Sequence, residues 1–371
     1  MKNTFGHSVS LTLFGESHGP AVGGVIDGLA PGIPVDGEAI RRLLDRRRPS
    51  APWDTPRREA DDFRILSGVF QGKTTGTPLC IVLANQDQHS GDYEKNRGLA
   101  RPSHGDYAGF CKYHGYEDYR GGGHFSGRVT AALTALGAVL LTALAGTGVA
   151  LGTHILRCGG VEDRDFDCLE QDIACLNRAA FPVLTESRGE AMIAAILAAK
   201  EAGDSIGGVV QTAVTGLPAG LGEPWFDSVE GLLSHALFSI GGVKAVSFGD
   251  GFQLAELRGS QANDAMRMEK GRVITVTNRN GGINGGVSNG MPILFQCAVK
   301  PTPSIGREQQ TVNFLTGENA VLRIAGRHDP AIVRRICPVI DAVTALVLCD
   351  LLAQRYGTDV FTKGRPVCDM D

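Results

Sequence analysis

Residues 129–156 read VTAALTALGAVLLTALAGTGVALGTHIL, a stretch that contains no Asp, Glu, Lys or Arg. It is long enough to cross a membrane, but it is rich in Ala, Thr and Gly, and residues 146–148 (GTG) interrupt it. The leucines of its first part fall on one helical face: Leu133, Leu136, Leu140 and Leu144. This periodicity predicts a buried core helix rather than a membrane span. We therefore expect other elements to surround it, and no membrane partner.

Segments that predict strands and helices surround this stretch without a steady βαβ alternation. Short alternating or apolar runs predict strands at 8–14, 22–26, 79–84, 208–215, 273–277 and 293–299. Helix signals are the cap Asp36, a capping box of Ser187 and Glu190, the cap Asp227, and an apolar period over about 338–355. This mixture predicts the α+β class rather than a doubly wound sheet. No linker or repeat stands out, so we expect a single domain over residues 1–371.

Composition excludes several classes of protein. Of the 371 residues, 43% are hydrophobic, and 36 basic residues against 40 acidic ones leave a net charge of −4. No global positive field therefore attracts nucleic acid or an anionic membrane. The nine cysteines are odd in number and form no CxxC pair, which argues against a zinc site and a secreted disulfide framework. The N-terminal sequence has no signal-peptide pattern, so we expect a cytoplasmic protein with reduced thiols and no metal.

Familiar nucleotide-binding loops do not occur in the sequence. Gly72–Lys73–Thr74 resembles the end of a P-loop, but Ser67 stands where that motif requires glycine. There is no GxGxxG sequence either. Any cofactor must therefore bind in another way, and the 50 glycines suggest close backbone approach to a ligand.

A cluster of arginines lies between residues 41 and 58, where only two acidic residues occur. Its members are Arg41, Arg42, Arg46, Arg47, Arg48, Arg57 and Arg58. A solvated helix face is the commonest reason for such a run, and residues 46–48 also complement a helix C-terminus. A second interpretation is that several guanidiniums converge on a small polyanion. A third is an RNA-binding module, which the absence of interleaved aromatic residues and the acidic total disfavour.

Two histidines lie in small-residue loops: His18 within GESHGP (15–20) and His104 within RPSHGD (101–106). A lone histidine is more often structural, but two beside arginines suit proton transfer near a phosphate, because imidazole titrates near neutral pH. The run YRGGGHFSGR (119–128) lets backbone amides face an anion just before a helix. GRHDP (326–330) brings an Arg, a His and an Asp together, as a site or as a salt-bridged surface turn. On these residues alone, a flavin-free phosphate lyase or transferase stays open.

Taken together, these segments resemble the chorismate synthase family. The matching stretches follow one order along the chain: 15–20, 27–34, 45–49, 57–59, 72–78, 101–106, 118–128, 203–208, 216–224, 249–252, 300–304 and 326–330. The resemblance implies a lyase that eliminates phosphate from C3 and a proton from C6 of 5-enolpyruvylshikimate 3-phosphate to give chorismate, the last step of the shikimate pathway. It also implies reduced FMN as cofactor, a β-α-β sandwich with central helices between antiparallel sheets, and a homotetramer.

The resemblance also implies roles for individual residues. It makes His18 the group that protonates the reduced flavin, His104 the general acid for phosphate departure, and Asp329 the relay for the C6 proton. The expected substrate-binding arginines are Arg48, Arg101, Arg128 and Arg327. The expected flavin contacts are His124, Phe125, Ser126, Gly285, Lys300, Pro301, Thr302, Pro303, Ser304 and Arg327. Arg47 matches a position assigned to NADPH, the expected reductant.

The chain departs from the family pattern at two places. The family commonly has Arg-Ser-Ser-Ala-Arg where this chain has HFSGR (124–128), so the contacts of the first two side chains to the flavin phosphate are lost. Trp53 stands where some members carry a basic residue linked to NADPH. We therefore still expect the protein to use FMN, whereas these changes argue against the contact with NADPH.

Overall fold

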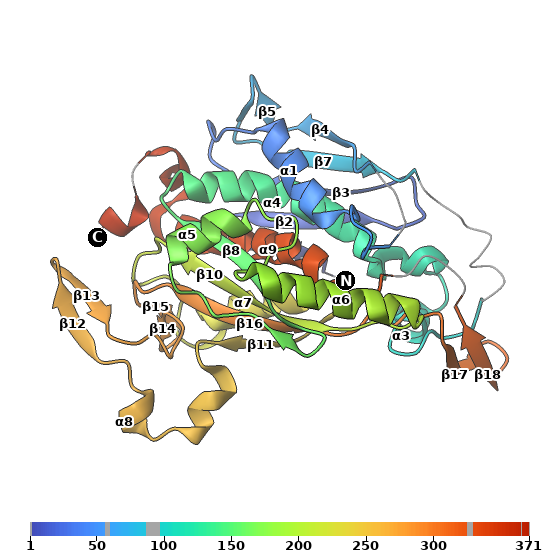
Figure 1. Cartoon of the computed structure of the whole chain (residues 1–371). Helices are drawn as coiled ribbons and strands as arrows, with labels where there is room; N and C mark the ends of the chain where they lie inside the picture. Colours follow the sequence, from blue (N-terminus) through green and yellow to red (C-terminus); the bar gives the residue numbers. More distant parts are fainter. Residues whose placement is uncertain (1, 56–59, 87–96, 325–328, 365, 371) are drawn as a thin grey trace.

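Two antiparallel five-stranded sheets enclose a central layer of helices (Figure 1). This computed structural model describes residues 2–55, 60–86, 97–324, 329–364 and 366–370. The first sheet has the order β1–β2–β3–β7–β4, with bounds Thr4–Phe5, Ser10–Gly15, Ala21–Asp27, Leu79–Ala84 and Phe63–Ser67. The second has the order β11–β16–β10–β8–β9, with bounds Val243–Phe248, Ile293–Val299, Gly208–Thr215, Ala150–Cys158 and Val161–Glu162. The predicted α+β sandwich is confirmed.

Four small hairpins project from these sheets. They are β5 (Val69–Phe70) with β6 (Lys73–Thr74), β12 (Met266–Glu269) with β13 (Arg272–Thr275), β14 (Ile283–Asn284) with β15 (Val287–Ser288), and β17 (Glu308–Asn313) with β18 (Glu318–Arg323). The β12–β13 hairpin stands away from the sandwich at the end opposite β17 and β18 (Figure 1). These hairpins add surface to the sandwich rather than core.

The layer between the sheets is made chiefly of α4 (Thr130–Ala145) and α9 (Val333–Tyr356). α4 packs on β3 and β7 of the first sheet, and α9 packs on β8 and β10 of the second. α1 (Gly37–Arg47) lies against both helices, and α7 (Val229–Phe238) lies between α9 and β11. The most apolar windows of the two central helices are 72% and 100% buried, although both are long enough to cross a membrane. They have the burial of core helices.

The remaining helices lie outside the central layer. α5 (Leu169–Leu176) covers part of β8 and β10, and α6 (Glu186–Glu201) lies beside β9. α3 (Asp106–Tyr113) follows the loop of His104, and α8 (Gly259–Ala262) precedes β12. The outer helices leave one end of the central layer accessible, where the loops that carry the histidines meet.

The structure places three helix starts differently from the sequence prediction. α6 begins at Glu186 after Thr185, so Ser187 and Glu190 do not form its capping box. α7 is capped by Ser228, whose side chain accepts a hydrogen bond from the Gly231 amide, and not by Asp227. The third, α9, begins at Val333 and continues through Pro338. The starts of α6 and α7 differ from the prediction by one or two residues, the usual uncertainty of helix ends, whereas α9 begins five residues before the predicted start at 338.

The contact between α4 and α9 depends on a glycine. A Cβ atom built on Gly137 would lie 2.2 Å from the Cβ atom of Ala342, far inside van der Waals contact. Gly in a helix interior normally costs up to about 1 kcal/mol relative to Ala. Here the glycine is required, because the two helix backbones meet at this point.

We therefore expect Gly137→Ala to lower the free energy of unfolding by about 1–3 kcal/mol, the usual cost of overpacking a core, although helix propensity alone predicts a gain. Urea unfolding measures the difference. Gly259→Ala is the control, because no atom lies within 4 Å of a Cβ atom at Gly259, and it should be nearly neutral. An unchanged or raised stability for Gly137→Ala would show that α4 and α9 can separate without cost.

Candidate active site

A large cavity of about 1260 Å³ lies at the helical layer, lined by residues of α4 and α9. Its floor is apolar and comes from α4 and α9: Leu133, Ile336, Val339, Val343 and Leu346. Its wall carries most of the predicted polar residues: His18, Arg47, Arg48, Arg101, His104, His124, Arg128, Lys300 and Asp329. Typical small-molecule pockets reach about 1,000 Å³, so this cavity has room for two ligands side by side.

The glycine run in η1 (Arg120–Phe125) brings the two predicted histidines to the same wall. Gly121, Gly122 and Gly123 have φ angles of 59°, 83° and 52°, a left-handed region that favours glycine. A Cβ atom on Gly121 would lie 2.2 Å from the His18 ring, and one on Gly122 would lie 3.1 Å from the His104 ring. The loop can therefore pass between the two imidazoles only because it lacks side chains.

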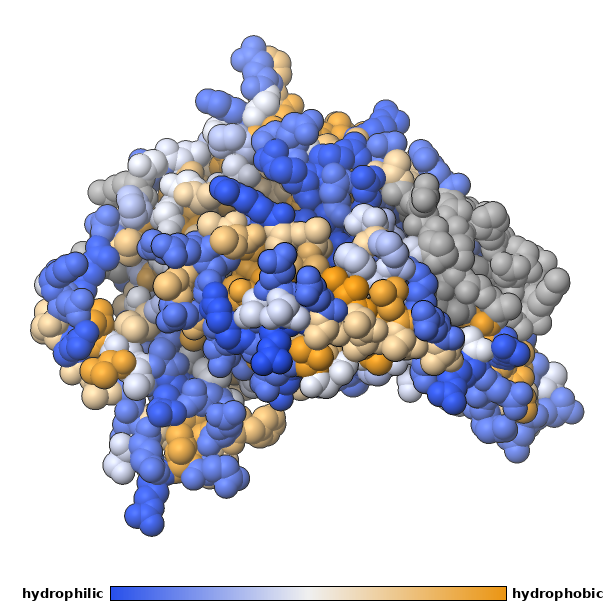
Figure 2. Space-filling view, in the orientation of Figure 1, coloured by the Kyte–Doolittle hydropathy of each residue, from blue (hydrophilic) through white to orange (hydrophobic). Residues whose placement is uncertain are grey.

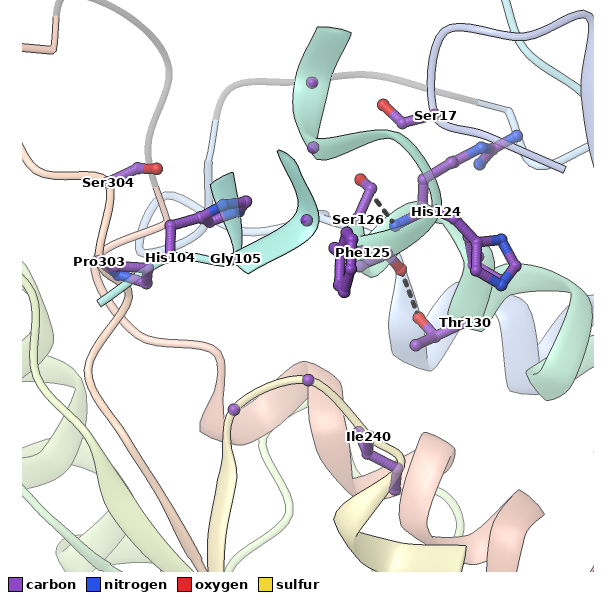
Figure 3. A pocket seen from close by; sticks show the side chains of 18 of the residues that line it. Ser17, His104, Gly105, His124, Phe125, Ser126, Thr130, Ile240, Pro303 and Ser304 are labelled. Carbon is purple, nitrogen blue, oxygen red and sulfur yellow. Dashed lines mark hydrogen bonds between the residues drawn. The ribbon is translucent and has the colours of Figure 1, made fainter. Parts of the chain in front are cut away.

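His104 belongs to a three-residue charge cluster (Figure 3 shows its ring in the cavity). Its Nδ1 lies 2.7 Å from Asp106 Oδ1, and Arg101 contacts the same carboxylate at 2.6 and 2.8 Å. Burial raises the pKa of Asp106, but the hydrogen bonds from Arg101 and His104 outweigh burial and hold it well below its usual value. Asp106 is therefore ionised at neutral pH and orients the imidazole through Nδ1.

His18 lies on the other side of the glycine run. Its Nδ1 is 2.9 Å from Ser17 Oγ, and the whole side chain is buried. The backbone of the loop is fixed by a hydrogen bond from the Ser17 amide to the Gly123 carbonyl. His18 and His104 therefore line one cavity from two loops, as the sequence predicted, with different hydrogen-bonding partners.

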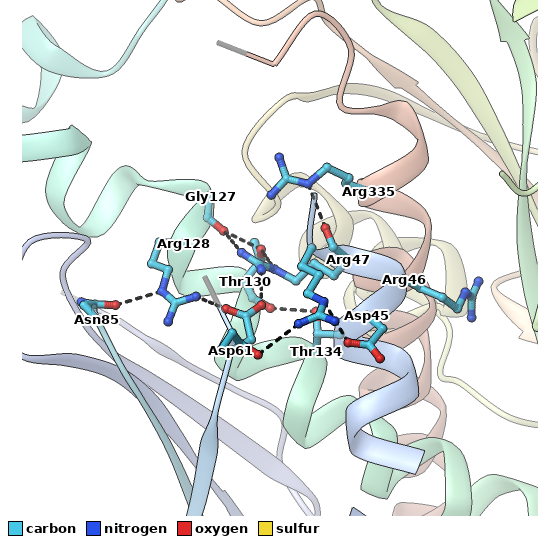
Figure 4. Close-up of polar contacts among 12 residues, drawn as sticks. Asp45, Arg46, Arg47, Asp61, Asn85, Gly127, Arg128, Thr130, Thr134 and Arg335 are labelled. Atoms are coloured by element: carbon cyan, nitrogen blue, oxygen red, sulfur yellow. Dashed lines mark hydrogen bonds and ion pairs between the residues drawn. The ribbon is translucent and has the colours of Figure 1, made fainter. Parts of the chain in front are cut away.

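Arg47 and Arg128 are joined by a buried carboxylate that the sequence analysis missed (Figure 4). Asp61 is 1% exposed and accepts from Arg47 Nη1 at 2.9 Å and from Arg128 Nη1. Arg47 also donates to Thr130 Oγ1 and the Gly127 carbonyl, both within 3.1 Å. All three side-chain nitrogens of Arg47 therefore donate hydrogen bonds within the protein. This arrangement disfavours the predicted contact of Arg47 with NADPH.

Arg128 is similarly engaged. Its Nε donates to Asn85 Oδ1 at 2.9 Å and its Nη2 to the Ala84 carbonyl at 3.1 Å. The side chain lines the cavity, but its geometry is set by the end of β7 and by Asp61. Its role in substrate binding stays a prediction.

Arg48 and Asp329 lie where α1 and α9 meet the cavity. Arg48 Nε is 2.9 Å from Asp45, and the Arg48 side chain is 35% exposed. Asp329 Oδ1 accepts from the Thr55 amide at 3.2 Å, while Oδ2 pairs with Arg335. Arg327, predicted to contact both substrate and flavin, lies outside the described residues.

The Lys300–Ser304 stretch lines the cavity beside the loop of His104 (Figure 3). Lys300 Nζ donates to the Ser103 carbonyl, which ties this stretch to the loop of His104. Thr302 Oγ1 is buried and has no hydrogen-bonding partner among the residues that the structure describes. Such an atom is costly unless a ligand satisfies it, so it supports the prediction that this stretch contacts a ligand.

The segment that departs from the family pattern also faces the cavity. His124 Nδ1 lies 2.8 Å from the Gly15 carbonyl, and Ser126 Oγ accepts from the Arg128 amide. The residue Phe125 is 48% exposed and its ring points into the cavity (Figure 3). Gly285, by contrast, lies in the β14–β15 turn and does not line the cavity. The structure therefore brings every described candidate except Gly285 to one place.

Sequence reasoning missed several residues of this cavity. Asp106 stands two residues after His104 in the stretch RPSHGD (101–106), so its closeness to the histidine was visible in the sequence. The stretch Ser239–Gly242 at the end of α7 lines the cavity, and its glycine pair was the signal available there. Asp61 and Arg335 carried no signal, because no sequence motif marks the 14-residue spacing of Asp61 from Arg47 or the six-residue spacing of Arg335 from Asp329.

Comparison with known proteins agrees with this geometry. The sequence profile of the family described as Chorismate synthase matches residues 9–353. The chain belongs to the chorismate synthase family. The chorismate synthase of Methanocella arvoryzae is 46% identical over 94% of this chain and 93% of its own length. That of Aeropyrum pernix is 44% identical over 95% of this chain and 93% of its own.

A solved structure supports the same assignment. A crystal structure of a chorismate synthase, 26% identical in sequence, superposes with a TM-score of 0.77 and covers 97% of both chains. As a chorismate synthase family member, the chain is a carbon–oxygen lyase that acts on phosphates. The cavity described above is its candidate active site.

We expect Asp61→Ala to destabilise the protein by about 3–5 kcal/mol, the cost of leaving buried charges unpaired. Arg47 and Arg128 both lose their carboxylate in this variant. Urea unfolding measures the change, with Asp62→Ala as the control. Asp62 is 63% exposed and pairs with Arg41 at 3.3 Å, so its loss should cost less than about 1 kcal/mol. Equal effects of the two substitutions would contradict the bridging role of Asp61.

We expect Asp106→Asn to lower turnover on the order of 10²-fold, by a similar factor at every pH from 6 to 9. The Asp106 pKa is lowered in the folded enzyme, so its carboxylate is charged throughout this range and holds the His104 ring through Nδ1. The substitution removes that carboxylate at every pH tested. Steady-state assays from pH 6 to 9 measure the loss. Wild-type turnover in the variant, or a loss confined to one end of this range, would contradict the orienting role of Asp106.

Proposed function

We propose that the cavity binds 5-enolpyruvylshikimate 3-phosphate beside reduced FMN, and that the enzyme eliminates phosphate to form chorismate. One observation carries this proposal: two histidines and a carboxylate, His18, His104 and Asp329, line one cavity that also has an apolar floor. Such a cavity can hold a flat ring on the floor and a polyanion against the wall. It also places proton donors and acceptors around the space between them.

The arginine cluster of α1 is better explained by this function than by RNA binding. Each described member has a carboxylate partner: Arg41 with Asp62, Arg42 with Asp36, Arg46 with Asp341, Arg47 with Asp61, and Arg48 with Asp45. The cluster therefore presents little uncompensated charge to a nucleic-acid backbone. A small anion in the cavity can still be bound by Arg48 and by Lys300.

The described residues fit a flavin. The floor of α4 and α9 and the ring of Phe125 offer apolar surface to a planar ring system, and Thr302 Oγ1 offers an unsatisfied buried polar atom. The Phe125 ring packs against Gly109, where a Cβ atom would lie 2.9 Å from the ring. The glycine therefore leaves the space that the ring occupies. When bound, reduced FMN would supply an electron-rich ring to the elimination.

The proton steps fall to the chain's own residues. Because Nδ1 of His104 faces Asp106, Nε2 is the atom available to protonate the departing phosphate oxygen. Asp329, held by Thr55 and Arg335, takes the C6 proton in the proposed relay. His18 holds a proton at the flavin, with its ring orientation set by Ser17.

We do not extend the proposal to NADPH. Arg47 is engaged with Asp61, and Trp53 packs edge-on against Phe181 with ring centroids 6.0 Å apart. Neither side chain offers a cation to a nicotinamide nucleotide. The proposed enzyme therefore receives flavin that has been reduced elsewhere.

Three broader features belong to the same proposal. One continuous hydrophobic core supports a single domain over residues 1–371. The projecting hairpin of β12 and β13 exposes Met266, Met268 and Val273 (Figure 2 shows apolar surface there), which supports assembly into a homotetramer. All nine cysteines are free thiols, which supports a reducing cytoplasmic location.

The deciding experiment is an anaerobic assay for chorismate with chemically reduced FMN, with and without NADPH. We expect product with reduced FMN, no product with oxidised FMN and NADPH, and a loss of about 10²–10⁴-fold in His104→Ala. Reduced-flavin binding should persist in that variant. Turnover without flavin would favour the flavin-free lyase, and tight, salt-dependent RNA binding would favour the nucleic-acid function.

A further inference from the structure

We propose that Arg335 is a positioning residue for the elimination, because it fixes the Asp329 carboxylate relative to the end of α1. This inference rests on the proposed function, in which Asp329 receives the C6 proton. Both side chains are 17% exposed and both line the cavity. Arg335 acts through Asp329 and not on the reacting atoms.

Arg335 makes two contacts that hold separate segments together. Its Nη1 donates to Asp329 Oδ2, and its Nε donates to the Arg47 carbonyl at 2.8 Å. Asp329 Oδ1 accepts from the Thr55 amide at 3.2 Å. With one oxygen on a backbone amide and the other on a guanidinium, the carboxylate cannot rotate without losing a hydrogen bond.

The position of Arg335 in α9 would be unfavourable without these partners. Arg334 and Arg335 both lie in the first turn of α9, where the helix dipole disfavours cations. The C-terminal carbonyls of α1 compensate, since Arg334 donates to the Arg46 and Arg48 carbonyls at 3.1 and 2.9 Å. The negative end of α1 therefore meets the arginines at the positive end of α9.

The two neighbouring arginines differ in one respect that makes them a matched pair. Arg334 is 4% exposed, pairs with Asp54 at 2.6 Å and does not line the cavity. Arg335 lines the cavity and contacts Asp329. Both residues hold α1, but only Arg335 also orients a residue of the proposed proton relay.

The test compares Arg335→Met and Arg335→Lys with Arg334→Met in the full-length enzyme. We expect Arg335→Met to lower kcat about tenfold to a hundredfold, the usual consequence of misplacing a reacting group by about 1 Å, with KM changed less than about threefold. Deuterium at C6 should slow this variant more than it slows the wild type, because proton removal becomes the slower step. Arg335→Lys should recover part of the rate.

Arg334→Met separates positioning from stability. We expect it to lower the melting temperature while leaving the C6 isotope effect at the wild-type value. Equal isotope effects in the wild type and Arg335→Met would overturn the proposal. A crystal structure of Arg335→Met provides an answer that does not depend on activity: we expect a displaced Asp329 carboxylate, and one in its original place would overturn the proposal. A wild-type enzyme that forms no chorismate would instead contradict the proposed function.

Discussion

The contact of α4 with α9 is the constraint on which the rest of the structure depends. Each helix covers one sheet, so their separation sets the distance between the sheets. Gly137 and Ala342 allow the two backbones to approach closely. The same helices form the cavity floor beyond this contact, so the core and the site share their apolar surface.

Buried carboxylates provide the second level of organisation. Asp54, Asp61 and Asp341 are each at most 3% exposed, and each pairs with an arginine of α1, of α9 or of the turn before α4. Burial without a partner would cost several kcal/mol per charge. Because of these pairs, Arg46 and Arg47 of the arginine-rich segment bind carboxylates inside the protein. Fewer cations of that segment then remain to bind an anionic ligand.

The sequence predicted what depends on local pattern. Strands such as Ile293–Val299, with alternating burial, and the core helix after residue 129 were found from periodicity alone. The family resemblance located His18, His104 and Asp329, and the structure brings all three to one cavity. Helix starts were less predictable, because neighbouring residues offer alternative caps, as Asp227 and Ser228 do for α7.

The sequence alone does not show which charges pair with one another. No motif marks Asp61, 14 residues after Arg47, or Asp329, six residues before Arg335, as the partner of that arginine. Each pairing depends on how the chain folds back on itself. The ligand-binding roles expected of the arginines remain predictions, because a guanidinium that lines the cavity can be held by a carboxylate of the chain as well as by a ligand.

The long-range pairing of these charges has a consequence for synthesis of the chain. Asp54 pairs with Arg334, 280 residues later in the chain, and the Val9 amide donates to the Asp350 carboxylate, 341 residues later. Contacts so distant in sequence form late in folding. Because α9 is synthesised after both sheets, a nascent chain has neither the cavity floor nor these counter-charges. The cavity is therefore complete only after the C-terminal part of the chain has been synthesised.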